Sequence, residues 1–274
     1  MKIEKIWAVF FSPAKSTEKI VIVTATEAAR ALGIETVHFL DLTKPENRKE
    51  PVCFEADDLI VIGTPTYAGR VPNKIMPYIR EKIKGNGASC IVLTTYGNRS
   101  FDDSLMELNL LMQENGFAVL GGGAFVCRHT FASGLAPERP AEADFEAARR
   151  LGKKAADKAE KAQMTPPQFP GNNPVGPYYT PKGIDGKPAV FLKARPVTDQ
   201  NRCTGCGLCA DRCPMGSIKE ADNYEVSGIC IKCQACIISC PTGAKFFDDE
   251  AFLSHKAMLE KTFADKQRIS EIFV

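Results

Sequence analysis

The first 162 residues alternate between short apolar runs and longer stretches with helical periodicity. Such runs predict five strands, at 5–11, 36–42, 58–63, 89–97 and 117–126. Apolar residues at helical spacing predict the intervening helices, at 17–32, 72–84, 103–115 and 137–162. Strands that alternate with helices in this way favour a parallel, doubly wound α/β sheet, so residues 1–163 are expected to form one α/β domain.

The second half of the chain shows a different pattern. Residues 164–195 are rich in proline and glycine, which excludes a helix or a central strand there. A flexible linker is one interpretation, but Phe169, Tyr178 and Tyr179 favour an ordered strap that they would anchor. Residues 196–247 form a cysteine-rich unit, and residues 248–274 carry an amphipathic segment that predicts a C-terminal packing helix.

Composition narrows the class of protein. The 274 residues are 44% hydrophobic and 25% charged, with a formal net charge of +2. This balance does not indicate a nucleic-acid or membrane-surface partner. No apolar run has the length of a membrane span, and the first residues are too charged for a secretory signal. We therefore expect a cytoplasmic protein with no nucleic-acid partner and no membrane span.

Eight of the eleven cysteines lie between residues 203 and 240. They form two copies of C-x2-C-x2-C-x3-C-P, CTGCGLCADRCP and CIKCQACIISCP, a spacing typical of bacterial iron–sulfur proteins. In each copy the first three thiolates can wrap one 4Fe–4S cluster, whereas the fourth points to the other cluster. The spacing therefore predicts two ligand sets: Cys203, Cys206, Cys209 and Cys240 for one cluster, and Cys230, Cys233, Cys236 and Cys213 for the other.

A pair of zinc sites is the alternative interpretation of these cysteines. Zinc usually takes two CxxC pairs per ion, often with histidine, and the duplicated run with its CP endings does not follow that pattern. A disulfide framework is disfavoured because the cysteines are clustered in a chain without an evident signal peptide.

The loops after the first, third and fourth strands are the candidate ligand sites of the α/β domain, because ligands bind at the carboxyl ends of parallel strands. The loop SPAKST, 12–17, lies directly before a helix, where hydroxyls, helix amides and Lys15 can surround a phosphate. Ordinary N-capping by Ser16 or Thr17 remains possible there. The loop matches neither a dinucleotide-binding G-x-G-x-x-G motif nor an NTPase P-loop.

Two aromatic loops flank this phosphate-ready loop. Tyr67 lies in GTPTYAGRVP, 63–72, and Tyr96 lies in TTYGNRSFDD, 94–103. Together the three loops predict a pocket for a planar, phosphorylated ring. Arg128 and His129 follow the fifth strand on the same side of the sheet, which makes them candidates for binding a substrate anion or donating a proton.

The stretches FSPAKST, GTPTYAGRVPN and YGNRSFDD, together with the duplicated cysteine run, resemble the fused flavodoxin–ferredoxin proteins of anaerobes. This resemblance implies a flavodoxin-like, doubly wound five-stranded parallel sheet of order 2-1-3-4-5, followed by a small α+β two-cluster ferredoxin-like domain. It also implies bound FMN, although Ala14 and Lys15 stand where the family commonly has threonine and glycine. The implied phosphate ligands are Ser12, Lys15, Ser16 and Thr17. The implied ring contacts are Thr66, Tyr67, Ala68 and Gly69 on one side, and Thr95, Tyr96, Gly97 and Asn98 on the other.

The function implied by the resemblance is intramolecular electron transfer between FMN and two 4Fe–4S clusters, with a ferredoxin-like protein as external donor or acceptor. Charges in the cysteine-rich unit are balanced, unlike the acidic face of many free ferredoxins, which favours an electron partner within the same chain. One alternative is a flavin-dependent reductase of a small organic substrate that receives electrons through the clusters. Another is an α/β domain that binds no flavin.

Overall fold

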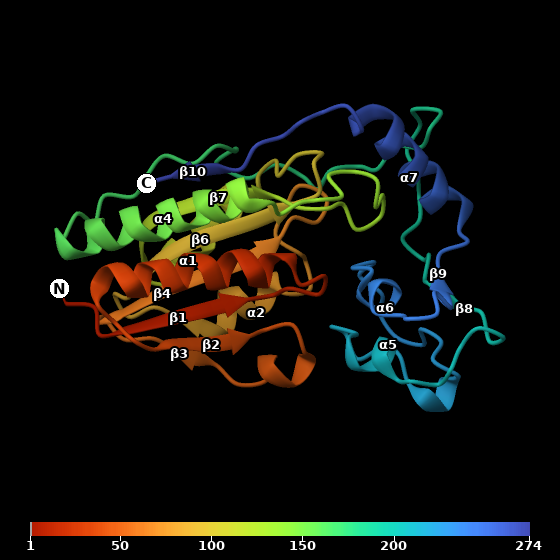
Figure 1. Ribbon diagram of the computed structural model, residues 1–274, viewed down its shortest axis with the longest axis horizontal. Coiled ribbons are helices and arrows are strands. Elements are labelled where there is room, and N and C mark those ends of the chain that lie inside the picture. The colour runs from red at the N-terminus through yellow and green to blue at the C-terminus, as the bar shows by residue number, and fades with distance from the viewer. Residues whose placement is uncertain (1) are drawn as a thin grey trace.

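The apolar runs of the first half form parallel strands of one sheet in the computed structural model, which describes residues 2–274 (Figure 1). These strands are β1 (Lys5–Phe10), β2 (Val37–Asp41), β4 (Asp58–Pro65), β6 (Ser89–Tyr96) and β7 (Ala118–Val126). They lie side by side in the order β2-β1-β4-β6-β7. The doubly wound α/β class is confirmed. The strand order reverses between β1 and β4, and ligands bind at such a point in this class of fold.

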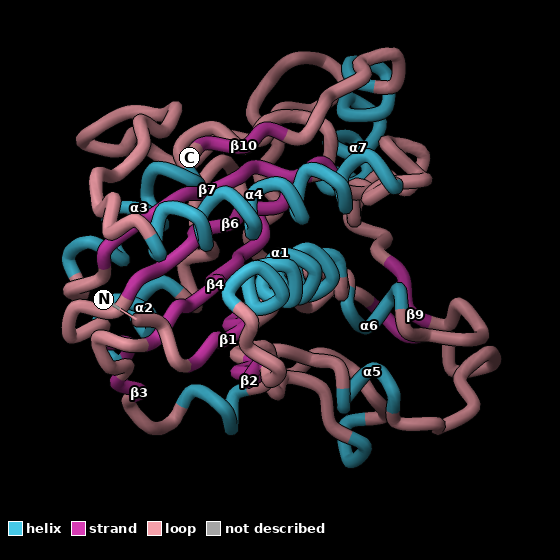
Figure 2. Tube along the Cα trace, turned by 60° about the vertical axis from the view of Figure 1, so that its left-hand side comes forward, coloured by secondary structure: helices cyan, strands magenta, loops and turns pink. Residues whose placement is uncertain are grey.

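Helices cover both faces of the sheet. One face carries α1 (Ser16–Leu32) and α4 (Glu142–Glu160), and the other carries α2 (Met76–Lys82) and α3 (Ser104–Glu114) (Figure 2). Because both faces are covered, β4 and β6 are apolar and buried along nearly their whole length. A β-carbon at Gly152 would lie 2.3 Å from the Thr24 carbonyl oxygen, so this glycine allows α4 to pack closely on α1.

Two helices begin later than their periodicity predicts, and a proline explains each difference. The helix expected from residue 72 begins at Met76, because Pro77 lacks an N–H and is tolerated only in a first turn. The helix expected from residue 137 begins at Glu142, after Pro140. Asp144 then accepts a hydrogen bond from the N–H of Ala141 at 2.7 Å and caps this end.

The sheet has a sixth strand, so the expected count of five is wrong. The helix α7 (Glu250–Phe263) is present, but residues beyond it return to the sheet as β10 (Glu271–Phe273), antiparallel to β7. The glycines at 121–123 of β7 allow this approach: a β-carbon at Gly123 would lie 3.1 Å from the Glu271 carbonyl oxygen. The segment 248–274 is therefore a helix followed by a strand, not a packing helix alone.

The cysteine-rich unit lies beyond the carboxyl ends of the parallel strands (Figure 1). Its short elements are β8 (Val197–Thr198), α5 (Leu208–Asp211), the 3-10 helix η2 (Glu220–Asp222), α6 (Ala235–Ile238) and β9 (Lys245–Phe246), with β8 and β9 antiparallel. Small elements also edge the α/β domain: the 3-10 helix η1 (Pro45–Arg48), and β3 (Val52–Cys53) parallel to β5 (Ile83–Lys84). Arg48 at η1 donates a 2.7 Å hydrogen bond to the Pro214 carbonyl, which joins the two units.

The proline-rich segment follows the surface of the α/β domain through specific contacts. Phe169 is buried against Phe273, and the Tyr178 hydroxyl donates to the Val71 carbonyl at 3.1 Å. Tyr179 donates its N–H to the Ala68 carbonyl at 2.8 Å, and its ring lies under the Arg99 guanidinium. These contacts are those of an ordered strap, while the boundaries at 163/164 and 195/196 stay predictions.

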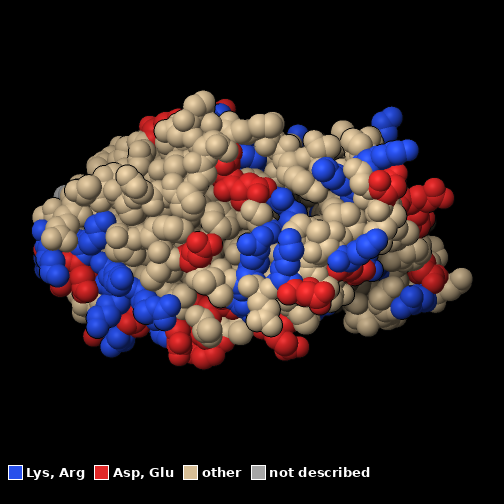
Figure 3. All heavy atoms as spheres, turned by 90° about the horizontal axis from the view of Figure 1, so that it is seen from above, with Lys and Arg blue, Asp and Glu red and all other residues tan. Residues whose placement is uncertain are grey.

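Basic and acidic side chains are interspersed on the face seen in Figure 3. Among the helices formed by residues 2–274, we find none with both the length and the apolar character that crossing a membrane requires.

Candidate functional site

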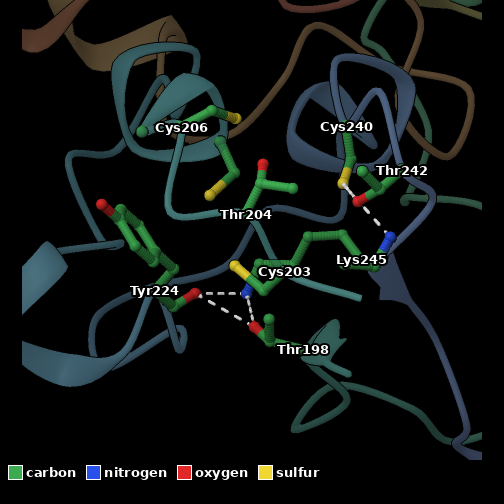
Figure 4. Close-up of a pocket in the computed structure, with 11 residues that line it drawn as sticks. Thr198, Cys203, Thr204, Cys206, Tyr224, Cys240, Thr242 and Lys245 are labelled. Atoms are coloured by element: carbon green, nitrogen blue, oxygen red, sulfur yellow. Dashed lines mark hydrogen bonds between the residues drawn. The ribbon is translucent and has the colours of Figure 1, made fainter. Parts of the chain in front are cut away.

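The eight clustered cysteines surround two separate cavities. Four of them line the first cavity, shown in Figure 4: Cys203, Cys206, Cys209 and Cys240. The other four line the second: Cys213, Cys230, Cys233 and Cys236. In each cavity the fourth cysteine comes from the opposite copy of the motif, which is the grouping that the spacing predicts. Ligation itself stays a prediction.

Left-handed backbone positions shape each cysteine loop. Gly205 and Gly207 take φ of 69° and 74° in the first loop, whereas Lys232 and Gln234 take 59° and 66° in the second. Glycine adopts this conformation without strain, so the second loop is held in place by its contacts instead. One such contact is the 2.8 Å hydrogen bond from the Lys232 ammonium to the Leu192 carbonyl of the strap.

Backbone amides point at the cysteine sulfurs. The N–H groups of Ser217, Lys232 and Ala244 donate to the sulfurs of Cys213, Cys230 and Cys240, at 3.3, 3.4 and 3.2 Å. Such N–H···S bonds favour thiolate over thiol and tune the potential of an iron–sulfur cluster. The donor set therefore fits a 4Fe–4S cluster in each cavity.

Burial sets the protonation of the uncoordinated thiols. It raises the pKa of Cys236 to about 12, and it raises the pKa of Cys209 although the Lys245 ammonium opposes this. At Cys240 burial is outweighed by hydrogen bonds from Thr242, Lys245 and Ala244, and the pKa falls below its ordinary value. Cys209 and Cys236 would thus be neutral on their own, and a bound metal supplies the charge that deprotonates them.

The loop after β1 has the shape expected of an anion site. Lys15 is the N-cap residue of α1 and has a left-handed backbone conformation. Its N–H donates to the Ser12 carbonyl at 3.1 Å, and its side chain forms no capping hydrogen bond with the helix. The Ser12 hydroxyl accepts the N–H of Glu18 at 3.0 Å. The first-turn amides of Ser16 and Thr17 face the same end of the helix, where its dipole favours negative charge. These residues fit a phosphate group.

The hydroxyls near this loop also make internal hydrogen bonds. Thr17 and Thr95 share a 2.7 Å hydrogen bond that joins α1 to the end of β6, and Thr66 bonds the hydroxyls of Thr94 and Ser104. The Lys15 ammonium lies 2.7 Å from the Glu18 carboxylate, so this cation is partly neutralised within its own loop.

The structure places the two aromatic loops differently. Tyr67 is half-buried in the loop after β4, and burial, with smaller contributions from Cys233 and Cys230, raises the pKa of its phenol. Tyr96 instead packs inward at the end of β6, with 5% of its surface exposed, and its hydroxyl donates to the Ile269 carbonyl at 3.3 Å. Of these two tyrosines, Tyr67 is therefore the one near the cysteine-rich unit.

The remaining residues of these loops hold the loops to their surroundings. Gly69 packs against Asp102, where a β-carbon would lie 2.4 Å from a carboxylate oxygen. Gly97 packs against His129, where a β-carbon would lie 2.6 Å from the imidazole ring. Asn98 takes a left-handed φ of 63°, and its amide donates to the Phe263 and Lys266 carbonyls at 3.1 and 2.8 Å. Their roles toward FMN stay predictions.

Arg128 and His129 lie at the end of β7 in contrasting environments. Arg128 is exposed. The Nδ1 of His129 accepts the N–H groups of Phe131 and Ala132 at 3.1 and 3.3 Å, and burial lowers the pKa of the imidazole to about 4. His129 is therefore neutral at pH 7 with its hydrogen on Nε2, an arrangement that caps a turn.

Lys245 is one of the balanced charges of the cysteine-rich unit, and it lines the first cavity together with Thr198 and Tyr224. Its apolar neighbours in the sequence AKFF, residues 244–247, are the signal that could have marked Lys245 as buried.

Comparisons with known proteins identify the cysteine-rich unit. Residues 196–219 and residues 227–243 each match a model of the 4Fe–4S binding domain. Over 70 residues the chain is 30% identical to the pyruvate synthase subunit PorD of Methanocaldococcus jannaschii, a match that covers 24% of this chain and 81% of that subunit.

Several solved structures are similar to the α/β half. A flavodoxin from the domain Archaea is 15% identical, with 57% of this chain and 99% of that chain covered and a TM-score of 0.42. Oxidised flavodoxin 2 from Bacillus cereus is 18% identical, with 56% and 99% covered and a TM-score of 0.41. Rubredoxin oxygen:oxidoreductase from Desulfovibrio gigas is 18% identical, with 60% and 38% covered and a TM-score of 0.43.

Proposed function

Because the chain belongs to the 4Fe–4S binding-domain family, and joins that domain to an α/β domain of flavodoxin topology, we propose that it transfers electrons internally, between FMN and two 4Fe–4S clusters. The 4Fe–4S domains give the protein an electron-transfer role. FMN can exchange one or two electrons and the clusters exchange one, so the combination would connect two-electron with one-electron chemistry.

The position of Tyr67 carries this proposal. Its loop is the one expected to contact the flavin ring, and its phenol lies within electrostatic reach of Cys230 and Cys233. In the same region Ile231, between these cysteines, packs against the core of the α/β domain. These contacts support the proposal that electrons pass between the second cysteine group and a flavin bound by the loop after β4.

The first cysteine group is the expected contact with an external redox protein. Cys206 is exposed, whereas Cys233 and Cys236 of the second group are buried. We expect a ferredoxin-like donor or acceptor to dock near Cys206, with electrons passing through the second group on the way to or from the α/β domain.

On the flavin side, the chain's own residues would bind and orient the cofactor. The amides at the start of α1 and the Lys15 ammonium would hold the phosphate, and the loop 66–69 would contact the ring. A substrate reductase would also need a proton donor near the ring. His129 is neutral at pH 7 and its Nδ1 is engaged by two backbone N–H groups, which supports the carrier over the reductase.

The test is anaerobic purification followed by analysis of iron, sulfide and flavin, and then by rapid mixing with a low-potential reductant. About eight irons and one FMN per chain are expected. Flavin reduction should follow cluster reduction at a rate independent of protein concentration. A rate proportional to protein concentration would show transfer between molecules and contradict the proposal. Protein with full iron content but no bound flavin would contradict it as well.

A Cys206→Ser variant sharpens this experiment, because it alters the first cysteine group and leaves Cys230 and Cys233, the cysteines near Tyr67, unchanged. Flavin reduction by the small reductant should slow, since the exposed entry group is impaired, while flavin content stays at the wild-type level. The exposed Cys53, in β3 of the α/β domain, gives a matched control, and Cys53→Ser should leave the rate unchanged.

A further inference from the structure

Lys245 is a buried cation with neutral partners. It lies in β9 with 2% of its surface exposed, and its ammonium donates to the Thr198 hydroxyl and the Tyr224 carbonyl. Figure 4 shows its side chain extending toward these two groups. Within residues 2–274 its ammonium forms no ion pair with a carboxylate. Burying an unpaired ammonium is costly, so a counter-charge is required nearby.

The first cysteine cavity is where that counter-charge belongs. Lys245 lines this cavity together with Cys203, Cys206, Cys209 and Cys240. A 4Fe–4S cluster with four thiolate ligands carries net negative charge, which grows by one when the cluster accepts an electron. A fixed cation beside such a cluster stabilises its reduced form more than its oxidised form.

We propose that Lys245 is a redox-tuning residue whose buried ammonium is the counter-charge of the cluster in the first cavity and raises the midpoint potential of that cluster. Thr198 and Tyr224 hold the ammonium in position and leave its charge uncompensated by protein. The inference rests on the clusters of the proposed function and not on its flavin.

The test is an EPR-monitored redox titration of the full chain and of Lys245→Met, which keeps the length of the side chain and removes its charge. The midpoint potential of the cluster in the first cavity should fall by at least a tenfold change in the reduction equilibrium, or 59 mV for one electron. Lys219 is exposed in the same unit, so Lys219→Met is the matched control and should leave both potentials unchanged. Unchanged potentials in a fully loaded Lys245→Met would overturn the inference.

Iron content and a second variant cover the case in which Lys245→Met does not assemble. If Lys245→Met loses iron while Lys245→Arg retains it, the positive charge is required and the inference holds. If both variants lose iron equally, the residue acts through packing and the inference fails. Wild-type protein without iron would instead refute the proposed function, which separates the two failures.

Discussion

Removing the Arg70 guanidinium should strongly destabilise the α/β domain. Arg70 and Glu107 form a bidentate salt bridge, with N···O distances of 2.5 and 2.8 Å. The Arg70 side chain is 13% exposed and the Glu107 side chain is 4% exposed. The same carboxylate accepts the Val71 N–H at 2.8 Å. Arg70 also donates to the Gly176 carbonyl of the strap and lies over the Tyr178 ring, 5.0 Å from its centroid.

The magnitude follows from burial. In Arg70→Met the Glu107 carboxylate stays buried with one backbone donor, and breaking a buried pair in this way costs about 3–5 kcal/mol. That is a large part of the roughly 5–15 kcal/mol typical of a folded domain. In the double variant Arg70→Met/Glu107→Leu no charge is left unpaired, so most of the lost stability should return.

The assay is anaerobic urea unfolding followed by tryptophan fluorescence. The chain has one tryptophan, Trp7 in β1, whose indole N–H donates to Asp58 at 3.1 Å, so the signal reports on the sheet. Arg80 and Glu114 provide the control, because their N···O distance is 4.0 Å and their side chains are 52% and 62% exposed. Arg80→Met should cost no more than about 1 kcal/mol. Equal small losses for Arg70→Met and Arg80→Met would refute the reasoning from burial.

Four further results are expected. Gly97→Ala should lower the free energy of unfolding by about 1–3 kcal/mol, because its β-carbon would lie 2.6 Å from the His129 ring; an unchanged urea midpoint would show that the ring moves freely. Burial lowers the pKa of His129 to about 4, so the unfolded chain takes up the proton first as pH falls, and stability should drop by about 2 kcal/mol between pH 7 and pH 5. This drop should be smaller in His129→Asn, and equal pH profiles would contradict the assignment. Cys213→Ser should remove about half of the iron and perturb the cluster of the second motif rather than its own, as shown by iron analysis and EPR; a change confined to the first motif's cluster would argue against crossed ligation. Asp103 accepts the N–H groups of Asn172 and Gly176 at 2.9 and 2.7 Å, so Asp103→Ala should speed limited proteolysis within 164–180, and unchanged cleavage would mean that other contacts hold the strap.

Local patterns were sufficient to predict most of the fold. The parallel strands are buried on both faces, so each appears in the sequence as an apolar run, and the cysteine spacing predicts the membership of both cavities. The strand β10 could not be predicted, because its three residues pair with β7 across more than a hundred positions and its apolar side chains are few.

The candidate site was predicted less completely for a related reason. Tyr67 and Tyr96 both follow strands and look equivalent in sequence, but Tyr96 is covered by the segment around Ile269 that returns toward β10. The same segment receives the hydrogen bonds of Asn98 through Phe263 and Lys266. Which side chains face a ligand thus depends on contacts between residues distant in the chain, and local periodicity does not report them.

The return of the chain to β7 gives the cysteine-rich unit two attachments to the α/β domain, the strap before it and the segment leading to β10 after it. A unit tethered once can swing away when its single tether loosens, whereas a doubly tethered unit stays near its partner when either attachment opens locally. During synthesis the outer edge of β7 is covered only after all eight clustered cysteines have been translated. Closure of the sheet can therefore follow insertion of the clusters, so that assembly of the two cofactor-bearing units is ordered by the path of the chain itself.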